Sequence, residues 1–286
     1  MYASFSPADP QMHPRIASTG LAGEDTGAPR DTHGPGLTDT HCHLNDPAFE
    51  GRVAAVLARA REAGVGQVIV PGWDAASSRR ALALAAEFPA ILPAVGLHPW
   101  MVAAEADTRW VAVLAAESRA VAIGEIGLDG AVEAPLAWQL PVFRAQLALA
   151  RERDLPVLLH CRAAWEPLLA CLREVPGVRG VLHAFNGSVE VLRECLAMGL
   201  YVAFGGGVTR PNNRRAQQAA IAAPADRLLL ETDAPSIGQD GVPPAAVEPR
   251  HVVPVLRRLA ALRGEDAAAL GARIVENVRA LLNHRP

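Results

Sequence analysis

The sequence Asp39-Thr40-His41-Cys42-His43 follows the first apolar segment of the chain, which starts near Leu37. In an extended strand, residues two apart point to the same face, so His41 and His43 are predicted to direct their imidazoles into one space. Such a pair suits a divalent metal. An open, doubly wound sheet would carry a glycine-rich phosphate turn at this place, so the H-C-H sequence favours a different α/β architecture.

Short apolar runs alternate with segments of helical periodicity along the chain from Leu37 onward. The eight runs expected to form strands are Thr38–His41, Gln67–Val70, Ile91–Val95, Val121–Ile123, Val157–Leu159, Gly180–Leu182, Tyr201–Phe204 and Leu228–Leu230. The segments expected to form helices are Val53–Ala63, Ser77–Glu87, Glu105–Glu117, Leu136–Arg153, Trp165–Arg173, Val189–Met198, Asn212–Ala222, Arg250–Leu262 and Asp266–Leu282. Eight alternating units predict a single-domain (β/α)8 TIM barrel over residues 37–286.

Composition narrows the chemistry that the chain can perform. All 27 basic residues are arginine, which excludes a Schiff-base lysine, a P-loop lysine and a carboxylated lysine that bridges two metals. The formal net charge of -3 gives no global attraction for nucleic acid, so phosphate binding would depend on local arginines. Residues 1–36 are rich in Pro, Gly, Ser, Thr and Asp without apolar periodicity, and we expect them to form a disordered extension that adds nothing to the core.

The expected location of the protein is the cytoplasm. The four cysteines have no paired spacing and are expected to be reduced thiols; they are Cys42, Cys161, Cys171 and Cys195. No apolar run has the length of a membrane span, and the N-terminus lacks the pattern of a signal peptide. No feature of the sequence indicates an oligomeric state, and a monomer is the default expectation.

Residues that commonly bind metals recur at the carboxyl ends of the predicted strands. They are His41 and His43 after the first strand, Glu125 after the fourth, His160 after the fifth, His183 after the sixth and Asp233 after the eighth. These strand ends form one rim in a barrel, so the six side chains are predicted to converge. Imidazole and carboxylate ligands suit zinc or manganese, and magnesium less well. Six ligands are too many for one catalytic ion, so we expect two divalent ions with Glu125 between them.

Six motifs, in this order, resemble those of the TatD family of metal-dependent hydrolases. They are D-T-H-C-H, G-L-H-P (Gly96–Pro99), G-E-I-G-L-D (Gly124–Asp129), L-L-H-C-R (Leu158–Arg162), H-A-F-N-G (His183–Gly187) and L-E-T-D-A-P (Leu230–Pro235). The resemblance covers residues 37–283. It implies a site for two metal ions and, in several members, cleavage of phosphodiester bonds in DNA.

The resemblance also implies roles for single residues. His41, His43 and Asp233 would hold the first metal, His160 and His183 the second, and Glu125 would bridge them. Water activated by the metals would be the nucleophile, with Asp233 as the candidate general base.

Other polar residues are candidates for contacts around the metals and the substrate. Asp39 and Asp129 could accept hydrogen bonds from ligand imidazoles, or could be solvated strand ends. His98 and Arg162 are the candidates for substrate binding, Arg162 as a bidentate phosphate ligand. A basic cluster after the seventh strand could bind phosphate or form a solvated helix face; it consists of Arg210, Arg214 and Arg215.

Three departures from the family pattern are expected on the substrate side. Asn186 replaces a frequent serine, Gly130 a frequent aromatic residue, and Val247 a frequent asparagine. They leave three functions to be distinguished: a phosphodiesterase such as a DNase, a hydrolase of esters or amides such as an aminoacyl-tRNA deacylase, and a scaffold without catalysis. Arginines at the rim would favour the first function and an apolar pocket the second, whereas the complete ligand set argues against the third.

Overall fold

The structure is a computed structural model that describes residues 36–117 and 119–282. The expected disordered extension over residues 1–36 therefore lies outside the described residues, except for Gly36.

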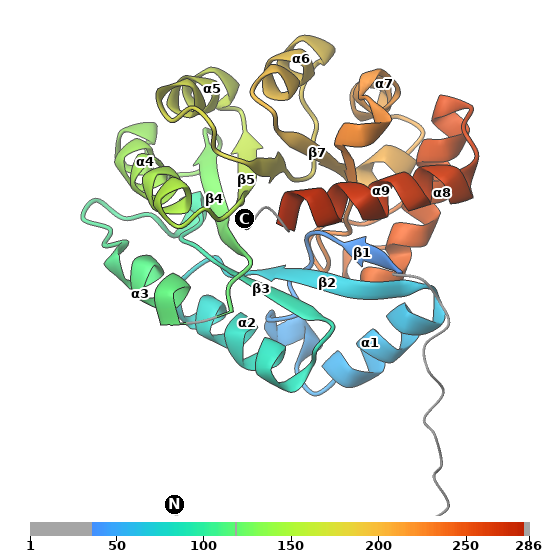
Figure 1. The fold of residues 1–286 in the computed structure, drawn as a ribbon, viewed down its shortest axis with the longest axis horizontal. Helices are drawn as coiled ribbons and strands as arrows, with labels where there is room; N and C mark the ends of the chain where they lie inside the picture. The colour runs from blue at the N-terminus through green and yellow to red at the C-terminus, as the bar shows by residue number, and fades with distance from the viewer. Residues whose placement is uncertain (1–35, 118, 283–286) are drawn as a thin grey trace, which may run out of the picture. The chain divides into compact units, whose positions relative to one another are not determined.

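Eight parallel strands form one sheet in the order of the chain (Figure 1). They are β1 (Leu37–Asp39), β2 (Val65–Pro71), β3 (Ile91–Val95), β4 (Ala122–Asp129), β5 (Val157–Arg162), β6 (Gly180–Leu182), β7 (Tyr201–Phe204) and β8 (Leu228–Leu230). The first strand meets the last through Thr40, whose backbone N–H and hydroxyl donate to the carbonyl oxygen of Leu230 at 2.9 and 2.8 Å. The predicted (β/α)8 barrel is confirmed.

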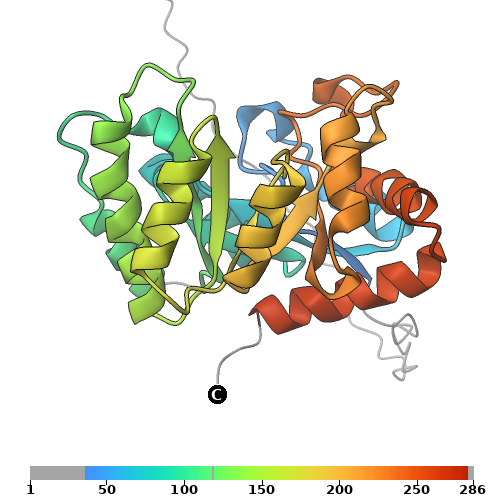
Figure 2. The ribbon, with the colours of Figure 1, turned by 90° about the horizontal axis from the view of Figure 1, so that it is seen from above.

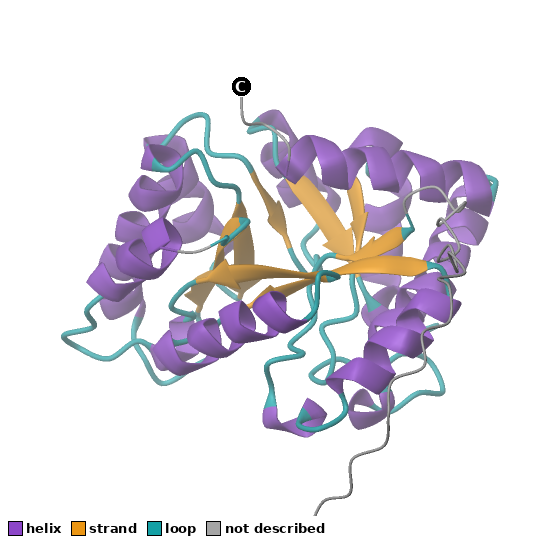
Figure 3. Cartoon of the chain, turned by 60° about the horizontal axis from the view of Figure 1, so that its bottom comes forward, coloured by secondary structure: helices purple, strands orange, loops and turns teal. Residues whose placement is uncertain are grey.

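Helices surround these strands (Figures 2 and 3). Within the described residues they are α1 (Val53–Glu62), α2 (Ala75–Glu87), α3 (Arg109–Glu117), α4 (Leu136–Glu152), α5 (Trp165–Glu174), α6 (Val189–Ala197), α7 (Arg214–Ala222), α8 (Val252–Arg263) and α9 (Ala267–Leu282). Each overlaps a segment predicted from helical periodicity. Local chemistry sets their ends: Asp74 caps α2 by accepting from the N–H of Ser77, and Gly264 ends α8 in the left-handed conformation.

Helix α9 closes the amino-terminal end of the barrel. Its Val278 and Leu281 pack against buried residues that face the barrel interior, among them Ile69, Leu158 and Leu229. Asn277 of the same helix donates to the carbonyl oxygen of Leu228, at the start of β8. With that end filled, the carboxyl ends of the strands are left as the accessible face of the barrel.

Strand β4 is longer than predicted, and this changes where Glu125 lies. The motif G-E-I-G-L-D is part of the strand, so Glu125 lies within β4 and not after its end, as His160 lies within β5. Its glycines hid the strand from sequence analysis, but close packing explains them. A Cβ atom on Gly124 would lie 2.6 Å from the Cβ of Leu158, and one on Gly127 would overlap the backbone of His160.

Candidate metal centre

A cavity of about 970 Å³ opens at the carboxyl end of the barrel. Five of the six predicted metal ligands line it: His43, Glu125, His160, His183 and Asp233. The sixth, His41, is fully buried but contacts Glu125, with 3.1 Å between Nε2 and Oε2. The structure thus brings all six residues together at one end of the barrel.

His41 and His43 reach this place from the segment directly after β1. The strand was predicted to include His41 but ends at Asp39. Backbone hydrogen bonds nevertheless continue on both sides, because the N–H of Cys42 donates to Ile69 at 3.1 Å and the N–H of His43 donates to Ala234 at 2.9 Å. The alternation of faces is therefore kept, and both imidazoles point toward Glu125 while Cys42 packs in the core.

The carboxylate of Glu125 is the centre of the cluster. Each of its oxygens faces a different group of imidazoles. Oε2 lies 3.1 Å from Nε2 of His41 and 3.5 Å from Nε2 of His43, whereas Oε1 lies 3.2 Å from Nε2 of His98, 3.2 Å from Nδ1 of His160 and 2.8 Å from Nε2 of His183. One buried side chain is thus shared by five histidines from four different parts of the barrel.

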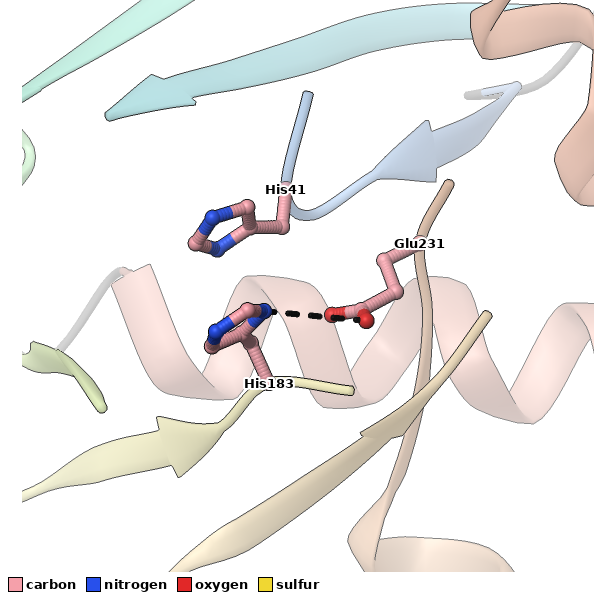
Figure 4. Close-up of side chains that lie close together, drawn as sticks. All are labelled: His41, His183 and Glu231. Carbon is pink, nitrogen blue, oxygen red and sulfur yellow. Dashed lines mark ion pairs between the residues drawn. The ribbon is translucent and has the colours of Figure 1, made fainter. Parts of the chain in front are cut away.

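Asp233 and Glu231 reach the cluster from the segment after β8. Oδ1 of Asp233 lies 3.3 Å from Nε2 of His43 and 3.9 Å from Nε2 of His41. Glu231 approaches from another side, with 3.8 Å between Oε1 and Nδ1 of His183 (Figure 4). The imidazoles of His41 and His183 are stacked there, with centroids 4.0 Å apart.

Members of the cluster differ in the direction in which their surroundings shift their pKa values. Burial raises the pKa of Glu125, but the charges of the neighbouring histidines outweigh burial and hold that pKa well below its usual value. Burial lowers the pKa of His41 to about 4, and the nearby His183 adds to this effect. Burial also acts against protonation of His160, yet the carboxylates of Asp129 and Glu125 raise its pKa to about 9. At neutral pH the site therefore combines the ionised carboxylate of Glu125 and the neutral imidazole of His41, the forms that bind metals, with a His160 that stays protonated until a cation displaces its proton.

Hydrogen bonding alone does not satisfy these side chains. Within the described chain, no hydrogen-bond partner is present for the buried Nδ1 atoms of His41, His43 and His183. Five imidazoles around Glu125 also exceed the roughly four positions at which a carboxylate accepts hydrogen bonds. Three groups of ligand atoms lie close enough to share an ion: His41 with His43 and Glu125, His98 with Glu125 and His160, and His41 with His183 and Glu231. The residues present fit divalent cations.

The two aspartates expected beside the ligands differ in their contacts. Asp129 lies where expected, with 3.1 Å between Oδ2 and Nε2 of His160. Neither alternative holds for Asp39 within the described residues, because its fully buried carboxylate accepts from the backbone N–H of His41 and from the N–H and hydroxyl of Thr232. Asp39 therefore joins β1 to the segment after β8.

The two residues predicted to bind substrate, His98 and Arg162, differ in their exposure. His98 is buried within the cluster, where it is a further candidate metal ligand, and its substrate contact stays a prediction. Arg162 is exposed and lines the cavity, together with Arg210 and Arg215. Arg214 is exposed but is not among the lining residues of the described chain.

Only one of the three departures from the family pattern lies in the cavity. Asn186 lines it, whereas Gly130 and Val247 are not among the lining residues of the described chain. Val247 is fully buried and packs in a cluster with Leu44 and Phe49. The expectation that all three lie on the substrate side was therefore wrong, because the segment around Val247 turns into the core.

Sequence analysis missed Glu231 and the aromatic lining of the cavity. Glu231 lies two residues before Asp233 in L-E-T-D-A-P, a spacing that would have placed both side chains on one face. The aromatic lining residues are Trp73, Trp100, Trp165, Phe185 and Phe204, and no periodic pattern connects them. Among the described residues, no helix is long and apolar enough to cross a membrane.

Comparison with known proteins gives concordant matches over nearly all of the barrel. The model of the family described as TatD related DNase matches residues 38–283. Metal-dependent hydrolase YabD of Bacillus subtilis is 36% identical over 86% of this chain and 98% of its own length. The 3'-5' ssDNA/RNA exonuclease TatD of Erwinia tasmaniensis is 38% identical over 86% of this chain and 100% of its own length.

The solved structure of YjjV, a TatD homologue from Escherichia coli, has the same fold. It superposes with a TM-score of 0.80 at 33% identity and covers 87% of this chain and 98% of its own chain.

Proposed function

The chain belongs to the TatD family of metal-dependent hydrolases, and we propose that it is a phosphodiesterase that cleaves single-stranded nucleic acid with two divalent cations. The observation that carries this proposal is the position of Glu125, whose two oxygens face separate groups of histidines beneath a cavity lined by three arginines. The name of the Erwinia tasmaniensis relative, an exonuclease of single-stranded DNA and RNA, supports the same class of substrate.

The geometry around Glu125 suggests how the ligands divide between two ions. His41 and His43 lie near Oε2 of Glu125, and Asp233 lies near both of these histidines; the three would hold the first ion. His160 and His183 are near the other oxygen and would hold the second. Zinc and manganese suit this imidazole-rich set better than magnesium does.

Bound divalent cations would supply Lewis acidity toward the phosphate and lower the pKa of the attacking water. Asp233 is proposed to accept the proton of that water. Its own pKa is raised by burial but held below the usual value by the stronger effect of His43 and the neighbouring histidines, so it is ionised at neutral pH. An ionised carboxylate at the metals has the form that a general base requires.

The lining of the cavity favours a phosphodiester over an uncharged ester or amide. Arg162, Arg210 and Arg215 line a cavity to which tryptophan and phenylalanine side chains also contribute. Guanidinium groups bind phosphate oxygens in a bidentate way, and aromatic rings stack on bases without selecting a sequence. A small uncharged ester or amide offers no chain of phosphates for several arginines.

A substrate panel tests the proposed function. Metal-depleted protein would be reloaded with zinc, manganese or magnesium and given single-stranded DNA, RNA, a small carboxylic ester and an amide. We expect cleavage of DNA or RNA that depends on the added metal. Arg162→Ala should raise KM for the oligonucleotide about 10-fold, whereas Arg273→Ala, which removes an exposed arginine of α9, should leave KM unchanged. Cleavage of the ester or amide alone would overturn the proposal.

A further inference from the structure

The aromatic side chain of Trp100 is exposed at the mouth of the cavity. It lines the cavity, yet 56% of it is exposed. It belongs to a short 3-10 helix, η2 (Pro99–Met101), which begins directly after His98. An exposed indole beside the candidate metal centre presents an aromatic surface that a ligand in the cavity can contact.

The ring is fixed in place despite its exposure. Its indole Nε1 donates a hydrogen bond of 2.6 Å to Oδ2 of Asp129, a fully buried carboxylate. Its backbone N–H donates to Nδ1 of His98 at 3.2 Å, and the two rings meet at 88° with centroids 4.9 Å apart. One side-chain hydrogen bond and an edge contact hold the indole, and the backbone hydrogen bond fixes the residue that carries it, so little side-chain entropy remains to be lost when a ligand binds.

Asp129 also connects Trp100 with the candidate metal centre and with an arginine. Oδ2 of Asp129 also lies 3.1 Å from His160, and the ring of Trp100 lies 6.0 Å from that imidazole. In the sheet, Asp129 pairs with Arg162, which lines the same cavity. A flat apolar surface, an arginine and the candidate metal centre thus line the same cavity.

We propose that Trp100 is a specificity-determining residue on which the base next to the scissile phosphate stacks. The inference rests on the proposed nuclease function. It adds a contact by which the protein would distinguish a nucleotide from a phosphodiester that has no base. Stacking is independent of base identity because every base has an aromatic face, so the contact favours nucleic acid without selecting a sequence. The Asp129 hydrogen bond keeps the indole face turned to the cavity, and Arg162 binds the phosphate of the same nucleotide.

The test compares an intact oligonucleotide with one that carries an abasic sugar beside the scissile bond. For the wild-type protein, removal of the base should raise KM about 5- to 100-fold, the range expected for one stacked base. Trp100→Leu and Trp100→Phe both lose the hydrogen bond to Asp129, but only the phenylalanine keeps an aromatic face. The leucine variant should bind both oligonucleotides with similar KM, and the phenylalanine variant should recover most of the difference.

Trp138→Ala is the matched control, because it removes a tryptophan that is 43% exposed on α4 and is not among the cavity-lining residues of the described chain. It should discriminate against the abasic substrate as the wild type does. The inference is overturned if the leucine variant keeps the wild-type ratio, or if the wild type cleaves both oligonucleotides with equal KM. A wild-type protein that cleaves no nucleic acid overturns the proposed function itself, so the two failures are distinguishable.

Discussion

Oε1 of Glu125 lies 2.8 Å from Nε2 of His183, the shortest of the five contacts between this carboxylate and the imidazoles around it. Glu125 comes from the middle of β4 and His183 from the end of β6, so the barrel, and not the local sequence, brings them together. In this arrangement one carboxylate faces two sets of candidate metal ligands.

Asp129→Asn tests whether the carboxylate that contacts His160 supports metal binding. The variant keeps the size of the side chain but removes the charge that orients and polarises the imidazole. We expect metal affinity or turnover to fall by about 10- to 100-fold, as is typical when such a partner is lost. Titration with zinc or manganese measures the affinity. Asp226→Asn, which changes an exposed aspartate at the opposite end of the barrel, should bind metal as the wild type does.

Asp233→Asn tests the proposed general base. The amide cannot take a proton from water, so kcat should fall by at least about 10²-fold across the whole pH range. Single-turnover hydrolysis at saturating metal separates this loss from weaker metal binding. A variant that recovers wild-type kcat when more metal is added would show that Asp233 acts only as a ligand.

Glu231→Gln tests the carboxyl group that sequence analysis missed. Oε1 of Glu231 accepts from the N–H of Ala184 at 2.6 Å, and a glutamine can keep that hydrogen bond. The protein should therefore fold with an unchanged melting temperature. If Glu231 contributes a ligand atom beside His41 and His183, the variant should bind its metal more weakly. Unchanged affinity would limit Glu231 to positioning the backbone after β6.

Glu248→Gln gives a pH-dependent effect on stability that is independent of the metal centre. Arg59 binds both oxygens of Glu248, at 2.7 and 2.9 Å, and lowers its pKa below the usual 4.5 despite partial burial. A lowered pKa in the folded state adds stability above the unfolded pKa, and this stability is lost as the pH falls through the folded value.

The melting temperature of Glu248→Gln should accordingly lie a few degrees below that of the wild type at pH 7, and the gap should shrink as the pH falls below about 4.5. Thermal unfolding followed by circular dichroism measures it. Glu276→Gln, in an exposed pair with Arg273, should melt with the wild type at both pH values. A gap that grows in acid would contradict the assignment.

Periodicity predicted nearly every element of the barrel, because apolar runs and amphipathic segments report directly on which faces are buried. It failed at β4, where Gly124 and Gly127 are required by the close approach of β5 and carry no strand signal. It also ended β1 too late, since Thr40 leaves the strand to bind Leu230 of β8. Both errors arise from contacts between strands that are distant in sequence.

Site residues at the ends of strands could be predicted from the sequence. Residues whose contacts depend on the direction of the side chain could not. His41 and His160 could be placed from their motifs alone. The burial of His98 within the cluster and the turn of Asp39 toward Thr232 depend on the paths of neighbouring segments. The position of Trp100 gave no signal in the sequence, because it depends on a hydrogen bond to Asp129, which lies in β4.

The metal content of purified wild-type protein and of Glu125→Gln tests the central claim most directly. The substitution keeps shape and volume but removes the charge that two cations would share, and the strand should stay folded because Ile123 and Ile126 remain buried. We predict about two divalent ions per wild-type chain and about one or none in the variant, with hydrolysis lowered by at least about 10²-fold. A folded variant that holds as much metal as the wild type, with near-normal turnover, would contradict the account.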